Sequence, residues 1–273
     1  MKVKLLPVNE EEVIRKLYVA CRTCYSAGSP ITNYEKEFTE EAHSKEDMLK
    51  LIKYVMSSGH HSVLEHVQLT FLIEGISRSD SHQWVRHRLA SISQQSQRYV
   101  EFKDGKFDFV IPKSIDVTDS LRSEFETTML FLGNMYKKFI EAGVPAEDAR
   151  AILPNACCTN MTWSCNLREL IWIMGERRCA CAQEPIRNLA AAIAKEVGEV
   201  LPFMKPYLGP KCEMLGYCNE PKRTCGRKKL KEDVLGGYAK DEDTLTPELI
   251  EAMKNPKFNE KLAELMKMES VIE

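Results

Sequence analysis

The sequence has 273 residues, and its 44% hydrophobic content is sufficient for a substantial buried core. Its 38 basic and 40 acidic side chains nearly cancel, so the net charge of −2 excludes a general attraction to nucleic acid or acidic membranes. Any anion site must therefore be local. The longest apolar run, 189–194, is too short to span a membrane. Without a secretory start, the ten cysteines are expected to be reduced thiols of a cytoplasmic protein.

The first half of the chain carries signals for three helices and one strand. A capping box at 9–12 opens a helix predicted over 10–24. A second helix is predicted to begin at Ser44 and to stop near Gly59. Alternating apolar residues over 67–74 predict a strand. Ser79 is expected to cap a short helix carrying Gln83, Trp84 and Arg86, after which the serine-rich sequence is predicted to unwind into a loop.

The second half carries mainly helix signals. Helices interleaved with few strands, without a regular strand–helix–strand repeat, indicate the α+β class. The composition becomes rich in lysine and glutamate after Gly209–Pro210, so 1–210 is expected to be the main domain and 211–273 an appendage. The predicted elements are a weak strand at 107–111, a long helix from Leu121 to Gly143, a short helix at 146–153, a strand at 157–163, a helix capped by Asn166, and a helix over 186–200.

The segment from Arg86 to Tyr99 is the clearest functional signal. It concentrates arginine, histidine, serine and glutamine without one acidic residue. Such a cluster repels itself unless an anion neutralises it, and guanidinium groups bind phosphate bidentately. Alone, the triplet 86–88 would be typical of a solvated surface cluster. The later Ser96 and Arg98 favour a functional segment instead.

The spacing of this segment resembles the signature of the flavin-dependent thymidylate synthases. Arg-His-Arg at 86–88 is followed by seven residues, Ser96, and then Arg98. Five further segments resemble that family in the family's order. They are Cys21–Ser26, Gly59–His66, Ala149–Pro154, Asn166–Arg168 and Glu176–Gln183. The resemblance implies an α+β fold with a mostly antiparallel sheet flanked by helices, and it makes 1–210 the flavin- and nucleotide-binding catalytic domain.

The resemblance also implies an activity. The family methylates deoxyuridine monophosphate (dUMP) to thymidylate (dTMP), taking the one-carbon unit from methylenetetrahydrofolate. NADPH supplies hydride through flavin adenine dinucleotide (FAD). Homotetramers with shared active sites are implied, with no nucleic-acid or membrane partner. Two alternatives stay open: a flavin reductase or oxidase without folate chemistry, and a nucleic-acid-binding module that uses the Arg-His-Arg patch.

Residue roles follow from the resemblance alone. Arg177 is implied as the catalytic residue that activates the uracil, and Arg150 as a contact made from a neighbouring subunit. Gln83 and Arg86 are expected on one helical face that reaches the nucleotide. The implied dUMP-binding residues are Gln83, Arg86, Gln94, Gln95, Ser96, Gln97, Arg98, Arg150 and Arg177. The implied FAD-binding residues are Cys24, Ser62, Arg86, His87, Arg88, Gln94, Asn166 and Arg168.

Three positions depart from the family pattern. Ser93–Gln94 replaces a common Asn-Glu, so a carboxylate contact becomes an amide contact. Cys181 stands where the family often has histidine or arginine, at a flavin contact. Pro185, following Glu184, is expected to break or restart a helix.

Metal binding is not predicted, although two groups of residues invite it. The segment 61–66 resembles an inverted zinc-protease motif but has one residue too many between its histidine and glutamate. The thiols of Cys21 and Cys24 are expected to pack as small apolar groups. Cys212, Cys218 and Cys225 leave two alternatives open, because they would bind zinc with a fourth ligand or remain reactive loop thiols.

Overall fold

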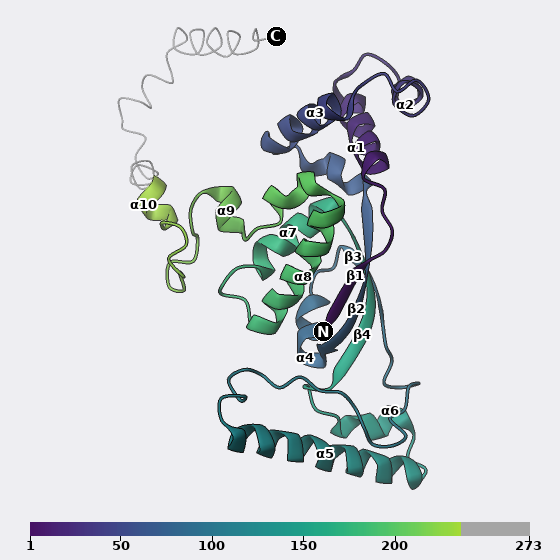
Figure 1. The fold of residues 1–273 in the computed structure, drawn as a ribbon, viewed down its shortest axis with the longest axis vertical. Helices are drawn as coiled ribbons and strands as arrows, with labels where there is room; N and C mark the ends of the chain where they lie inside the picture. Colours follow the sequence, from purple (N-terminus) through teal and green to yellow (C-terminus); the bar gives the residue numbers. More distant parts are fainter. Residues whose placement is uncertain (236–273) are drawn as a thin grey trace, which may run out of the picture. The chain divides into compact units, whose positions relative to one another are not determined.

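The computed structural model describes residues 1–235 (Figure 1). The chain divides into two units, Met1–Met214 and Leu215–Glu273. All of the predicted site residues belong to the first unit. The different roles expected for 1–210 and 211–273 stay a prediction, and much of the appendage lies outside the described residues. Within the described part, no helix is long and apolar enough to cross a membrane.

The first unit is built around one antiparallel sheet. Its strands are β1 (Lys2–Leu5), β2 (Gln68–Ser77), β3 (Ala90–Gln94) and β4 (Cys158–Asn166), in the order β1-β2-β4-β3. Phe71 of β2 and Ile92 of β3 both pair with Trp163 of β4, which fixes the register at the sheet centre. The α+β class and the mostly antiparallel sheet are therefore confirmed.

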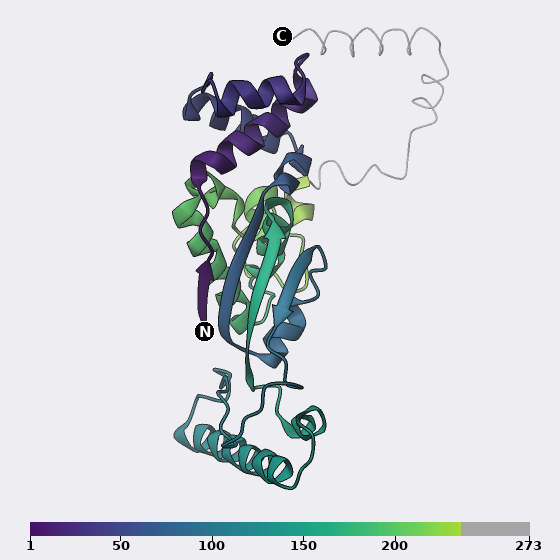
Figure 2. The ribbon, with the colours of Figure 1, turned by 90° about the vertical axis from the view of Figure 1, so that its right-hand side faces the viewer.

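The two faces of the sheet differ in polarity. Alternate residues of β2 and β4, including Phe71 and Trp163, point into the core and are fully buried. The opposite face is polar, and there the Thr70 and Ser164 hydroxyl oxygens lie 2.8 Å apart across the two strands. Figure 2 shows the polar face turned toward the viewer, with the green helices behind the sheet. The functional elements therefore lie at the sheet's ends and edge and on its helical side.

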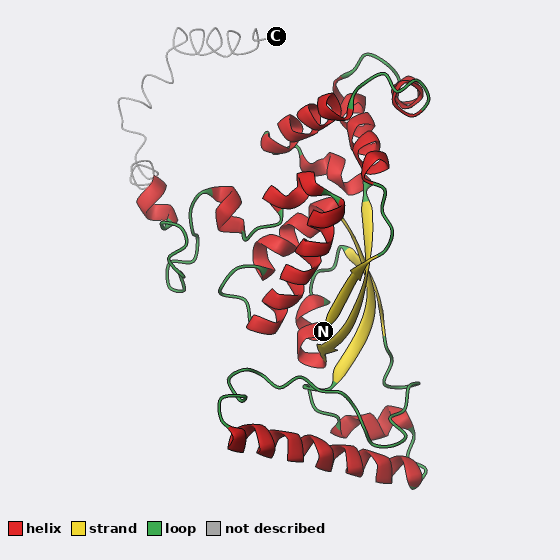
Figure 3. Cartoon of the chain, viewed as in Figure 1, coloured by secondary structure: helices red, strands yellow, loops and turns green. Residues whose placement is uncertain are grey.

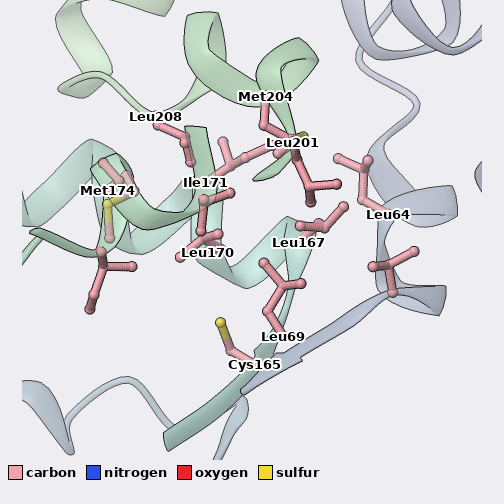
Figure 4. Close-up of a cluster of buried hydrophobic side chains, with 14 of the residues drawn as sticks. Leu64, Leu69, Cys165, Leu167, Leu170, Ile171, Met174, Leu201, Met204 and Leu208 are labelled. Atoms are coloured by element: carbon pink, nitrogen blue, oxygen red, sulfur yellow. The ribbon is translucent and has the colours of Figure 1, made fainter. Parts of the chain in front are cut away.

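Helices α4 (Arg78–Trp84), α7 (Leu167–Arg177) and α8 (Glu184–Val200) pack on the apolar side of the sheet (Figure 3). Figure 4 shows how Leu64 and Leu69 meet Leu167 and Leu170 in this core, and all four are fully buried. Truncating one such leucine to alanine typically costs 2–5 kcal/mol. The core thus fixes α7 and, at its end, Arg177.

The first unit contains further helices, and α10 belongs to the second unit. The 3-10 segments are η1 (His61–His66), η2 (Arg150–Ile152) and η3 (Pro202–Tyr207). The α-helices are α1 (Glu10–Tyr25), α2 (Pro30–Phe38), α3 (Lys45–Ser57), α5 (Asp119–Glu141), α6 (Ala146–Ala149), α9 (Lys211–Leu215) and α10 (Lys231–Leu235).

Local capping signals were predicted correctly. Asn9, Ser44 and Asn166 each cap the expected helix, because each side chain accepts a hydrogen bond from the backbone three residues later. Helix α8 begins at Glu184 with Pro185 in its first turn, so the expected restart of a helix at this position is confirmed.

Other predictions of local structure were wrong. The loop expected after the Arg-His-Arg triplet is strand β3, since pairing with β4 overrides the weak strand propensity of its serines. Ser77, not Ser79, caps α4 with a complete capping box. The strand predicted at 107–111 reduces to one bridge between Phe109 and Cys157. Strand β1 and helix α2 were not predicted.

Candidate active site

The guanidinium group of Arg177 is held from two directions at the end of α7. Its Nε donates a hydrogen bond to Nε2 of His87 at 2.9 Å, and Nη2 donates to the backbone carbonyl of Gln83 at 3.2 Å. Three of the predicted residues therefore meet, although 90 residues separate His87 from Arg177 in the sequence. We call these three residues the Arg177 cluster.

The Arg-His-Arg triplet divides between the interior and the solvent. His87 is only 8% exposed, while Arg86 and Arg88 are both exposed. Burial, with a further contribution from the Arg177 cation, lowers the pKa of His87 to about 4, and Glu176 opposes the shift. The prediction that Gln83 and Arg86 share a helical face was wrong, because α4 ends at Trp84.

The far end of β3 is fixed by amide side chains. Gln94 Nε2 donates to the hydroxyls of Ser81 and Thr159, at 3.0 and 3.1 Å. The side-chain amide of Asn160 donates to Gln95 Oε1 at 3.0 Å. An ionised carboxylate at position 94 could only accept from these hydroxyls. Gln94 thus donates two hydrogen bonds to protein hydroxyls that an ionised glutamate could not donate.

The segment after β3 forms a turn that carries Arg98. Ser96 Oγ accepts a hydrogen bond from the Arg98 backbone amide at 3.1 Å. Two nitrogens of the Arg98 side chain, Nε and Nη2, both contact Oε2 of Glu147 in α6, each at 2.9 Å. Arg150 Nε donates to the Glu147 backbone carbonyl at 3.1 Å. The structure therefore brings two predicted phosphate ligands, Arg98 and Arg150, to one glutamate.

A polar cavity of about 320 Å³ lies beside this turn. Gln97 and Arg150, both predicted site residues, line it together with Arg78 and His82, which the sequence analysis missed. Arg78 and His82 are four residues apart and share one face of α4. The helix expected after Ser79 excluded Arg78; with the cap at Ser77, the four-residue spacing within α4 is the signal that would have found both residues. We call the turn 96–98 and the residues of this cavity the phosphate cluster.

Two further predicted residues line a larger groove between α1, α2 and η1. Cys24 and Ser62 lie on this groove of about 720 Å³, whose walls include Val19, Tyr34 and Phe38. The volume is within the range of ordinary small-molecule sites. The lining also contains polar and charged residues, so the groove suits an aromatic ligand that carries polar substituents. These residues are Glu12, Lys16, Thr23, Cys24, Ser62 and His66.

Asn166 and Arg168 lie at the start of α7, the end opposite Arg177. The Asn166 side chain accepts from the Glu169 backbone amide at 2.8 Å, and Arg168 forms an ion pair with Glu65 of η1. Both side chains are therefore engaged within the chain. Because α7 packs on η1, which also carries Ser62, these residues belong to the same end of the unit as the groove.

Strand β3 separates the Arg177 cluster from the phosphate cluster. Arg88 precedes the strand and Ser96 follows it. Five extended residues at about 3.4 Å each span roughly 17 Å. Arg177 is not among the residues that line the cavity of the phosphate cluster, although His82 of that cavity directly precedes Gln83, whose carbonyl holds Arg177.

Among residues 1–235 no group of three or more histidine, cysteine or acidic side chains is arranged to hold a metal ion. None of the ten cysteines, all in this range, forms a disulfide. In the histidine-rich segment, His61 Nε2 lies 3.0 Å from the carbonyl oxygen of Met56.

The first unit combines an α+β fold, two separate sites that contain arginine and a groove with apolar walls, which suits a protein that binds an anionic and an aromatic ligand. Residues 7–203 match the family model described as thymidylate synthase complementing protein. The chain belongs to this family, that of the flavin-dependent thymidylate synthases. The predicted family is confirmed, and with it the prediction of an enzyme.

Curated relatives cover most of the chain, and each bears the name flavin-dependent thymidylate synthase. The protein of Geobacter sulfurreducens is 44% identical over 227 residues, covering 83% of this chain and 94% of the relative. That of Nitratidesulfovibrio vulgaris is 40% identical over 242 residues, covering 85% and 97%. That of Thermococcus onnurineus is 40% identical over 223 residues, covering 76% and 90%.

Proposed function

We propose that this chain methylates dUMP to dTMP with FAD as cofactor, methylenetetrahydrofolate as one-carbon donor and NADPH as reductant. Family membership supports the reaction class. The observation that carries the assignment of the site is the guanidinium of Arg177, held by His87 and by the carbonyl of Gln83 at the end of a buried helix. It forms a fixed cation beside the Arg-His-Arg segment.

Arg177 is the proposed catalytic residue. With Nε and Nη2 anchored, Nη1 makes no hydrogen bond within the described residues and remains available to a pyrimidine oxygen. The uracil ring accumulates negative charge on its carbonyls as C5 becomes nucleophilic. A preorganised donor at that position stabilises the charge, and losing such a donor typically costs 10²–10³ in turnover.

The phosphate cluster is proposed to hold the 5′-phosphate of dUMP. Arg78, Arg98 and Arg150 supply positive charge, and the turn at Ser96 offers backbone amides beside them. Ser96 is assigned to binding and not to nucleophilic attack, because its oxygen accepts a hydrogen bond from the Arg98 amide and no described histidine activates it.

FAD is proposed to bind along the groove that contains Cys24 and Ser62. Arg86 and Arg88 are exposed and would face its phosphates, with Arg168 and Asn166 at the start of α7. When bound, the flavin supplies the hydride transfer, so the chain's own residues need only to bind and orient the reactants.

We further propose a homotetramer with shared active sites, as the resemblance to the family implies, with Arg150 contributed by a neighbouring subunit. An active, flavin-loaded monomer in gel filtration would contradict this assembly.

The test compares wild-type protein with Arg177→Ala and with the control Arg122→Ala. Arg122 is a half-exposed arginine on α5, paired with Asp116 and Glu126. Wild type and both variants are expected to purify with flavin absorbance. Wild type and the control are expected to form dTMP from dUMP, methylenetetrahydrofolate and NADPH, while Arg177→Ala loses this turnover. Wild-type flavin reduction by NADPH without any dTMP formation would identify a reductase instead.

A further inference from the structure

The ring of His87 faces the protein interior and not the surface on which its two arginine neighbours lie. It is 8% exposed, and the edge of Trp84 packs against it with ring centroids 6.0 Å apart. Trp84 in turn packs against Trp163 of the central strand at 5.1 Å. These edge-on contacts tie the ring to two fully buried tryptophans, one of them in the central strand β4. His87 is therefore a buried residue, whereas Arg86 and Arg88 are exposed to solvent.

The contact with Arg177 fixes the protonation of this ring. A guanidinium group only donates hydrogen bonds, so His87 Nε2, at 2.9 Å from Arg177 Nε, must accept with its lone pair. The ring proton is therefore on Nδ1. The charged groups that act on the ring are Arg177 and Glu176, both on α7. Burial and Arg177 lower the pKa of His87 to about 4, so the ring stays neutral near pH 7.

Two acceptors bind different nitrogens of the Arg177 guanidinium group and thereby define its plane. His87 takes Nε–H, and the Gln83 carbonyl takes Nη2–H at 3.2 Å. With only one acceptor, the group could rotate about the remaining hydrogen bond. With both, its third nitrogen, Nη1, has a fixed direction.

We propose, building on the proposed function, that His87 is a positioning residue that acts through Arg177 by setting the plane in which the guanidinium meets the pyrimidine. The flavin contact implied for His87 is replaced in this assignment by a contact with the catalytic cation. The ring neither touches substrate nor exchanges a proton with it. Its contribution is orientation, and misplacing a catalytic group by about 1 Å costs on the order of 100-fold in rate.

The experiment uses full-length, flavin-loaded enzyme in five forms: wild type, His87→Ala, His87→Gln, Arg177→Ala and the double variant His87→Ala/Arg177→Ala. Flavin content, kcat and the KM for dUMP are measured for each. His87→Ala is expected to lower kcat by about 10- to 100-fold while keeping its flavin. His87→Gln returns an acceptor oxygen near the former position of Nε2, so it should recover most of the lost kcat.

The double variant separates positioning from an independent role. If His87 acts only through Arg177, the double variant should be no slower than Arg177→Ala within about threefold. Losses that multiply would overturn the proposal. So would a His87→Gln enzyme that folds but is as slow as His87→Ala, or one that loses flavin while Arg177→Ala keeps it. A wild-type enzyme that forms no thymidylate would instead refute the proposed function itself.

Discussion

The pair of Arg98 and Glu147 makes a quantitative prediction about nucleotide affinity. Arg98 is proposed to bind phosphate, yet both of its engaged nitrogens contact the Glu147 carboxylate. Phosphate must displace this carboxylate or bind beside its negative charge. Replacing Glu147 by glutamine should therefore tighten dUMP binding. The helix should tolerate the change, because Arg150 contacts the Glu147 backbone carbonyl and not its side chain.

The expected size follows from exposure. The two side chains are 51% and 49% exposed, and pairs of this kind are worth about 0.2–1 kcal/mol. If dUMP no longer has to break this ion pair in order to bind, its dissociation constant falls by roughly 1.4- to 5-fold. Titration calorimetry of the flavin-loaded enzyme measures it, with Glu141→Gln as control, since Glu141 pairs with Lys137 at 3.7 Å on α5. Unchanged or weaker binding by Glu147→Gln would refute the reasoning.

Three further predictions concern stability and reactivity. Because the pKa of His87 falls from 6.5 unfolded to about 4 folded, the unfolded chain binds more protons between these values, and stability falls as the pH drops from 7 to 5. The free energy of unfolding measured in urea should fall by about 2 kcal/mol between pH 7 and pH 5 for the wild type, but not for His87→Gln. Gly133→Ala should destabilise by about 1–3 kcal/mol, since its new methyl group meets the Gly105 carbonyl oxygen; an unchanged midpoint in thermal unfolding contradicts this packing. Thiol labelling followed by mass spectrometry should modify the exposed Cys24 and Cys225 first, and Cys165, whose thiol pKa is raised by burial, only after unfolding.

Signals confined to a few neighbouring residues predicted structure well. The caps at Asn9, Ser44 and Asn166 depend on one side chain and one amide three residues away, so the sequence contains the whole interaction. Strand β3 was missed because its cause is distant. Ser91 and Ser93 are extended because they pair with β4, about 70 residues later in the chain.

In the candidate site, too, local patterns were predictable from the sequence and contacts between distant residues were not. The spacing of Arg86, Ser96 and Arg98 indicated an anion site, but not which way each side chain would point. That His87 would turn inward depends on Trp84 and Trp163, which meet only in the folded chain. The Arg98 partner Glu147 could not be predicted either, because 49 residues separate them and nothing local marks the pair.

Helix α4 has a consequence for the candidate site as a whole. One face carries Arg78 and His82 to the phosphate cluster, while its last turn offers the Gln83 carbonyl to Arg177. His82 and Gln83 are consecutive, so one short helix of about 10 Å carries residues of both clusters. A displacement of this helix by an anion at the phosphate cluster would be transmitted to the carbonyl that holds Arg177, so substrate titrations are the place to look for communication between the two clusters.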